Sequence, residues 1–236
     1  MRLYLALPLR GKSRLRNAVK TLLRPDGGVE RLRVGSSWIT LSHDNEATRN
    51  MAYGVYESNE LAIVRRHIRD GDVVVDVGAN VGYMSAHFAR YVGHSGKVFA
   101  FEPSPTAFAL LMGTEANNVL RNLFIYNMAV SDHVGKASYF ETEAILSHGY
   151  GRLDRRPSDR FAGTRSCSVN VTTIDAFATQ EHIDLARLRL VKIDVEGHED
   201  NVINGMRNIF SSGVRPALLT EFSGSSGNRV GDFGSF

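Results

Sequence analysis

The sequence predicts an α/β fold with a doubly wound, mostly parallel sheet and helices on both faces. Three observations support this prediction. Four short apolar runs, typical of strands buried on both faces, lie at Val73–Val77, Lys97–Phe101, Leu123–Tyr126 and Leu188–Ile193. Segments with helical patterns separate the first three runs along the chain. The length of 236 residues, of which 43% are hydrophobic and 22% charged, suits a single domain with a proper core.

Local patterns predict further elements around these four strands. The predicted helices cover residues 59–68, a segment that begins near Gly82, residues 106–117 and a segment that begins near Thr173. The additional predicted strands are residues 37–41, 135–140 and 216–220. Residues 147–166 are rich in Gly, Arg and Ser and lack apolar periodicity. We expect a long loop there, which is either a lid or a disordered segment.

The formal net charge of +3 is unevenly distributed. Residues 1–33 hold nine Lys and Arg against two acidic residues, a charge of +7, so the remaining chain carries −4. Between residues 12 and 24, basic and apolar residues recur at helical spacing, which predicts a basic amphipathic helix. We favour a solvated helix packed on the domain, with peripheral membrane contact as the alternative. The slightly acidic body, without interleaved basic and aromatic residues, indicates no nucleic-acid partner.

Cysteine content and the N-terminal pattern bear on the compartment. A single cysteine, Cys167, excludes an internal disulfide and a thiolate metal cluster, and it fits a reducing compartment. The apolar run at residues 3–9 contains Pro8 and ends at Arg10, so it is too short to span a bilayer. It also lacks the small-residue cleavage site of a signal peptide. We therefore expect a cytoplasmic protein.

A turn with two glycines follows the first buried strand. Gly78 allows a tight turn and Gly82 allows the helix and strand to approach, while the start of the helix offers free N–H groups to an anion. A dinucleotide site would have a second glycine where Asn80 stands, so a pyrophosphate is disfavoured. The carboxylate of Asp76 repels phosphates but suits a cationic ligand such as a sulfonium or an ammonium group.

An acidic residue stands at the end of the next strand. Glu102 lies twenty residues after Gly82, where the ribose-binding acid of a Rossmann-like fold belongs. A carboxylate at this position can accept hydrogen bonds from both ribose hydroxyls. The turn and Glu102 together favour a nucleoside without phosphates, and S-adenosylmethionine is such a nucleoside.

The sequence resembles the FkbM family of methyltransferases over residues 53–222. The blocks that carry the resemblance occur in that family's order, at residues 71–82, 101–103, 127–132 with Gly135, 173–175 and 191–199. The resemblance implies a class I methyltransferase fold, S-adenosylmethionine as cofactor, and methyl transfer to a hydroxyl, typically of a sugar or natural product. We therefore expect a small-molecule or carbohydrate acceptor.

The resemblance also implies roles for individual residues. The loop at the methionine side of the cofactor is assigned to Asp76, Gly78, Asn80 and Gly82. Glu102 is assigned to the ribose. Asn127 and Ala129 lie where the third strand ends, near where adenine would lie. For Asn127, a polar cap at the strand end is the alternative role.

Methyl transfer requires an aligned acceptor oxygen and a group that removes its proton. Asp194, Glu196 and His198 follow the strand Leu188–Ile193 and face the same predicted crevice. Asp194 is our first choice for the active-site role and Glu196 the second, while His198 is either a base or a packed turn residue.

Three charged neighbours of these residues receive other roles. We expect Glu199 and Asp200 to complement a helix N-terminus, and Lys192 to be the charge partner of a buried carboxylate. We expect no metal ion, because a hard cation needs more oxygen ligands than this segment offers.

We divide the chain into a basic N-terminal segment with a lead-in strand (1–52), a cofactor-binding domain (53–222) and a Gly/Ser-rich tail (223–236). The family's closing β-hairpin is missing from the tail, which leaves the strand at 216–220 uncovered. This predicts dimers, aggregation or a low melting temperature, with a homodimer as the possible assembly, unless residues 38–41 cover that strand.

Two other functions stay open. One is a non-catalytic S-adenosylmethionine-binding protein of the same fold. The other is an NAD-dependent oxidoreductase, which Asn80 and the lack of a Tyr-x-x-x-Lys pair disfavour.

Overall fold

The computed structural model describes residues 29–42, 51, 56–141, 151–153 and 164–220. The predicted basic helix at 12–24, the tail at 223–236 and most of the predicted loop lie outside the described residues. None of the helices in the described part combines the length and apolar character needed to cross a membrane.

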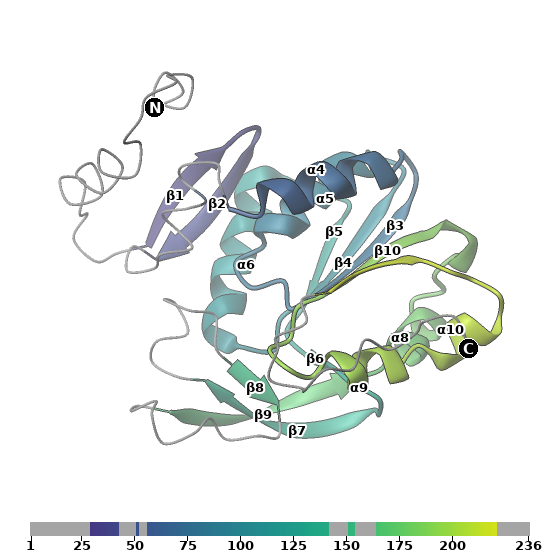
Figure 1. Ribbon diagram of the computed structural model, residues 1–236. Helices are drawn as coiled ribbons and strands as arrows, with labels where there is room; N and C mark the ends of the chain where they lie inside the picture. Colours follow the sequence, from purple (N-terminus) through teal and green to yellow (C-terminus); the bar gives the residue numbers. More distant parts are fainter. Residues whose placement is uncertain (1–28, 43–50, 52–55, 142–150, 154–163, 221–236) are drawn as a thin grey trace, which may run out of the picture.

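A five-stranded parallel sheet forms the centre of the molecule, in the order β11-β10-β3-β4-β5 (Figure 1). Its strands are β3 (Val73–Val77), β4 (Lys97–Phe101), β5 (Leu123–Tyr126), β10 (Leu188–Ile193) and β11 (Ala217–Thr220). The chain enters this sheet at β3 and continues through β4 to β5 at one edge. It then crosses back to β10, on the other side of β3. The order of the strands therefore reverses between β3 and β10, and the carboxyl ends at such a point bound a ligand crevice.

Helices cover both faces of this sheet, as the sequence predicted. Alternate residues such as Val74 and Val98 belong to a core with helices α4 (Ser58–His67), α5 (Tyr83–Tyr91) and α6 (Pro105–Asn118). Val75 and Val191 belong to a second core with α8 (Ile174–Gln180), α9 (Glu199–Asn204) and α10 (Arg207–Ser211). The 3-10 helix Leu185–Arg187 leads into β10. Burial on both faces explains why these strands are continuous apolar runs.

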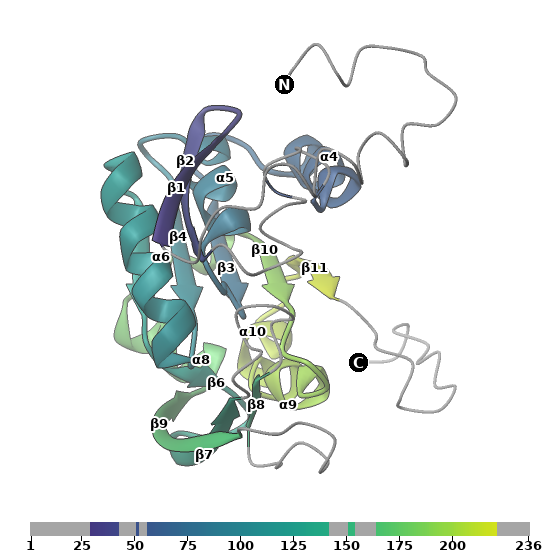
Figure 2. The same cartoon turned by 90° about the vertical axis from the view of Figure 1, so that its left-hand side faces the viewer.

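A second sheet lies beyond the carboxyl ends of the central strands (Figures 1 and 2). Its order is β6-β9-β7-β8, from Ala129–Val130, Arg165–Thr172, Gly135–Glu141 and Gly151–Leu153. The predicted strand at 135–140 is confirmed as β7. The loop prediction is wrong for residues 151–153 and 165–166, which pair with β7. Sequence periodicity missed β9 because its first half is polar and only Val169 and Val171 provide buried apolar side chains in alternation.

An antiparallel hairpin of β1 (Val29–Val34) and β2 (Ser37–Ser42) packs on α6. The backbone N–H of Thr40 donates to Thr114 Oγ1 at 2.9 Å, and that of Trp38 donates to Asn118 Oδ1 at 2.8 Å. The hairpin and β11 lie at opposite ends of the central sheet (Figure 2). Residues 38–41 therefore do not cover β11, which within the described part of the chain pairs with β10 alone.

Candidate functional site

The turn between β3 and α5 is held in a conformation that requires glycine. Gly78 has a φ of 80°, and a Cβ atom there would lie 1.8 Å from the carbonyl oxygen of Asp194. Gly82 has a φ of 83°, and its Cβ would lie 2.5 Å from Leu111 Cδ1 of α6. From the sequence we expected Gly82 to let the helix approach the strand. In the structure the close approach at Gly82 is to α6 instead. Asn80, between them, also adopts a left-handed conformation, with a φ of 51°.

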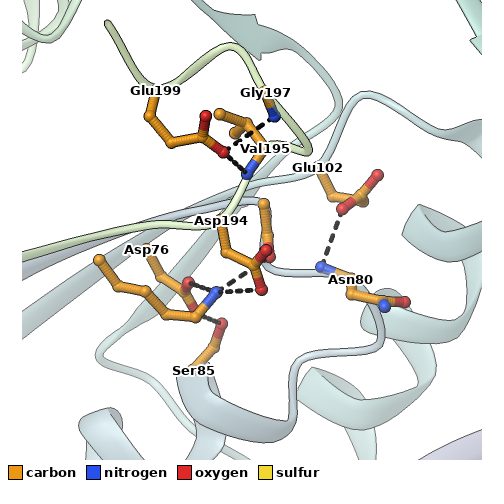
Figure 3. Close-up of polar contacts among 10 residues, drawn as sticks. Asp76, Asn80, Ser85, Glu102, Asp194, Val195, Gly197 and Glu199 are labelled. Carbon is orange, nitrogen blue, oxygen red and sulfur yellow. Dashed lines mark hydrogen bonds and ion pairs between the residues drawn. The ribbon is translucent and has the colours of Figure 1, made fainter. Parts of the chain in front are cut away.

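Asp76 is completely buried beneath this turn (Figure 3). Its Oδ2 accepts a hydrogen bond from Ser85 Oγ at 2.5 Å, and its Oδ1 lies 3.4 Å from Lys192 Nζ. Asp76 lines neither of the two cavities described below. The sequence led us to expect that this carboxylate suits a cationic ligand, and in the structure the cation beside it is Lys192; a cofactor role for Asp76 stays a prediction.

Lys192 also forms an ion pair with Asp194, 3.3 Å from its Oδ2, and donates to the carbonyl oxygen of Gly78 at 3.3 Å. The predicted role of Lys192 as partner of a buried carboxylate is thus confirmed. Burial alone lowers the pKa of Lys192, but the carboxylates of Asp76 and Asp194 outweigh it and raise this pKa above its ordinary value. Lys192 remains charged and holds the ends of β3 and β10 together.

Glu102, at the end of β4, is 6% exposed and is bound by the backbone on both sides. Its Oε2 accepts from the N–H of Asn80 at 2.8 Å (Figure 3), and its Oε1 accepts from the N–H of Ser104 at 2.8 Å. Burial raises the pKa of Glu102 to about 7, although these two hydrogen bonds lower it. The carboxylate is therefore fixed in place and changes charge near neutral pH.

A cleft opens at the carboxyl ends of the central strands, and we call it the strand-end cleft. Its lining residues are Val77, Gly78, Phe101, Glu102, Pro103, Met128, Ala129, Val130, Tyr139, Leu153, Asp194, Val195, Glu196 and His198. Most predicted site residues gather here. The opposite wall comes from the second sheet, through Tyr139 and Leu153, and the sequence did not indicate it.

A second cavity lies on the other side of the turn, and we call it the α4-side cavity. Its lining residues are Met51, Tyr56, Glu57, Gly78, Ala79, Asn80, Val81, Tyr83, Met84, Lys192 and Asp194. Gly78 and Asp194 line both cavities, so the two cavities flank the glycine turn. Glu57 was not predicted, because in the sequence it is one polar residue among several before a helix.

Asn127 and Glu199 have structural contacts. The side-chain amide of Asn127 donates to the carbonyl oxygens of Glu102 and Pro103 at 2.8 and 3.1 Å, which agrees with the strand-end cap. Glu199 begins α9, and its Oε1 accepts from the N–H of Gly197 at 3.0 Å (Figure 3). The predicted helix N-terminus at Glu199 is confirmed. His198 Nε2 lies 2.9 Å from Ser131 Oγ, which fixes the ring at the edge of the strand-end cleft.

Acidic and imidazole side chains in the described ranges form no group of three or more that could hold a metal ion. The carboxylates of Glu102, Asp194 and Glu196 and the imidazole of His198 line the strand-end cleft.

Comparisons with known proteins identify the family. The Methyltransferase FkbM domain matches residues 76–235. The chain is 29% identical to the hexuronic acid methyltransferase AglP of Haloferax volcanii, over 66% of this chain and 59% of that protein. It is 29% identical to the 31-O-demethyl-FK506 methyltransferase FkbM of Streptomyces tacrolimicus, over 76% of each chain. The crystal structure of methyltransferase FkbM from Methylobacillus flagellatus superposes with a TM-score of 0.42 at 16% identity, covering 88% of this chain and 48% of that one.

Proposed function

Because the chain belongs to the FkbM methyltransferase family, we propose that it transfers a methyl group from S-adenosylmethionine to a hydroxyl oxygen of a sugar or small natural product. The names of two relatives, a hexuronic acid methyltransferase and a 31-O-demethyl-FK506 methyltransferase, support a sugar acid or a natural product as the acceptor class. The chain spans 59% of the first of these proteins.

The observation that carries the proposal is the buried carboxylate of Glu102, which faces a mostly apolar cleft beside the glycine turn. A carboxylate suits the two hydroxyls of a ribose, and the neighbouring Met128, Ala129 and Val130 suit the face of a nucleobase. The glycine turn beside this cleft does not suit a pyrophosphate, since Asn80 stands where a pyrophosphate site requires glycine. The residues present therefore fit a nucleoside without phosphates.

In this proposal Glu102 holds the ribose, Ala129 contacts the adenine, and the turn at Gly78 and Asn80 holds the methionine end. When bound, S-adenosylmethionine supplies a methyl group on a positively charged sulfur. Asp76 acts indirectly, by fixing Lys192 beneath the turn. Gly82 also acts indirectly, by letting α6 pack closely against the turn.

The protein must also remove the proton of the acceptor hydroxyl. Asp194 is the first candidate, because it lines both cavities and therefore stands between them. Its Oδ2 lies 3.3 Å from Lys192 Nζ, which holds the carboxylate in place beside the glycine turn. Glu196 and His198 line the strand-end cleft alone and are the next candidates.

Calorimetric titration with S-adenosylmethionine, S-adenosylhomocysteine and NAD tests the cofactor. We expect both S-adenosyl ligands to bind and NAD to bind much more weakly. Tighter binding of NAD would contradict the proposal and favour an oxidoreductase. Release of S-adenosylhomocysteine in the presence of hexuronic acids or other hydroxyl compounds tests the transfer itself. Cofactor binding without transfer to any of them favours the non-catalytic alternative.

A further inference from the structure

We propose that Glu57 binds the α-ammonium group of the cofactor's methionine moiety, and that it selects nucleosides carrying an amino-acid group over those without one. This inference rests on the proposed function, because it assigns one end of the same cofactor.

The position of Glu57 supports this role. It lines the α4-side cavity together with Gly78 and Asn80 of the glycine turn. The adenosine end of a ligand whose ribose is bound by Glu102 would occupy the strand-end cleft on the other side of the turn. A group that extends from the ribose past Gly78 would therefore enter the α4-side cavity and meet Glu57.

The hydrogen bonding of Glu57 is incomplete. Its Oε2 is buried and has no hydrogen-bond partner. A buried carboxylate oxygen without a partner is costly unless a ligand satisfies it. An ammonium group offers three donors and a positive charge, so it would satisfy this oxygen better than a neutral ligand.

The charges around the cavity favour a cation. Within the described part of the chain, Glu57, Asp76 and Asp194 all act on one cation, Lys192. Lys192 pairs with the other two carboxylates at 3.4 and 3.3 Å, and among the residues that the structure describes Glu57 has no ion-pair partner of its own. When all four groups are ionised, the cluster is therefore negative and attracts a positively charged ligand.

The ionisation of Glu57 follows from the same surroundings. Burial raises the pKa of Glu57 to about 7, and Asp194 and Asp76 raise it further, whereas Lys192 and a hydrogen bond from Tyr56 lower it. Glu57 therefore changes its protonation state near neutral pH. An ammonium ligand favours the carboxylate form, so binding should release a proton to the buffer near this pH.

The test compares S-adenosylhomocysteine, which carries the amino-acid group, with 5′-methylthioadenosine, which lacks it. Calorimetry is carried out on the wild type, Glu57→Gln and the matched control Glu60→Gln on the same helix. Glu57→Gln should bind S-adenosylhomocysteine at least about tenfold more weakly, because a charge-assisted hydrogen bond is lost. Its affinity for 5′-methylthioadenosine should stay within about twofold of the wild type. Glu60→Gln should behave as the wild type with both ligands.

Repeating the wild-type titration at pH 7 in buffers of different ionisation enthalpy provides a second readout. The wild type should release more protons with S-adenosylhomocysteine than with 5′-methylthioadenosine, and Glu57→Gln should lose this difference. The difference in proton release between the two ligands on the wild type tests the role of Glu57 even if Glu57→Gln fails to fold.

Equal proton release with the two ligands, or a Glu57→Gln variant that binds both as the wild type does, would overturn the assignment. An equal loss of affinity for both ligands would also overturn it, because Glu57 would then act through the fold. If the wild type binds neither nucleoside, the proposed function itself fails.

Discussion

Replacing Glu102 by alanine tests the centre of the proposed site. If Glu102 accepts hydrogen bonds from both ribose hydroxyls, the substitution removes two charge-assisted bonds of roughly 1.5–3 kcal/mol each. The affinity for S-adenosylhomocysteine at pH 8 should then fall by about a hundredfold or more.

The variant should remain folded, because two effects on stability oppose each other. The N–H groups of Asn80 and Ser104 lose their acceptor, which costs about 1–3 kcal/mol each. Above pH 7 the buried, ionised carboxylate lowers the free energy of unfolding by about 3 kcal/mol, since its pKa is raised from 4.5 to about 7. Removing the carboxylate removes this destabilisation. A carboxyl group with a raised pKa favours the folded state most below pH 4.5, and this contribution is lost as the pH rises through 7. The stability of the alanine variant relative to the wild type should therefore increase over this range.

The same pKa predicts how binding depends on pH. Since the pKa of Glu102 is raised to about 7, its ionised fraction rises steeply as the pH passes through neutrality, so wild-type affinity for 5′-methylthioadenosine should rise several-fold, up to about tenfold, between pH 6 and pH 8. This ligand isolates Glu102, since it carries no ammonium group. The assays are calorimetry for binding and urea denaturation for folding. A folded alanine variant that binds S-adenosylhomocysteine within a few-fold of the wild type would refute the ribose assignment.

Two further predictions concern the strand ends. Asp194→Asn and Glu196→Gln should lower kcat about a hundredfold or more with little change in cofactor affinity, and His198→Ala should do so only if His198 is a base. Equal losses of turnover and affinity in steady-state kinetics and calorimetry would instead indicate cofactor positioning. Gly78→Ala should unfold at lower urea than Gly213→Ala: both residues have positive φ, but only Gly78 would place a Cβ against backbone, at 1.8 Å. Equal midpoints would contradict the close packing.

The central sheet could be predicted from the sequence, and so could much of the strand-end cleft. Strands such as Val73–Val77 are apolar throughout because both faces are buried, and this property is visible in one dimension. Glu102 could be assigned a site because its spacing from the glycine turn is fixed by the length of one helix and one strand. Asp194, Glu196 and His198 were found because the carboxyl ends of parallel strands share one edge.

Other parts of the molecule depend on contacts between distant segments. Glu57 reaches the site only because α4 packs beside the glycine turn, and no local pattern marks that packing. Tyr139 lines the strand-end cleft because β7 pairs with β9. The periodicity of the sequence did not predict β9, because the first half of that strand is polar. The burial of Asp76 against Lys192 joins the ends of two neighbouring strands that are far apart in the chain.

The sequence by itself therefore determined the α/β class, the glycine turn and the acids that follow each strand, because these features depend on periodicity and short spacing. Only the tertiary structure decided which carboxylates are paired and which remain available to a ligand. Asp76 and Glu57 illustrate the difference, since both are acids beside the same turn. Neither Asp76 Oδ1 nor Glu57 Oε2 has a hydrogen-bond partner, but Lys192 lies within ion-pair distance of Asp76 Oδ1. Pairing depends on distances of a few ångströms in space, which no sequence spacing specifies.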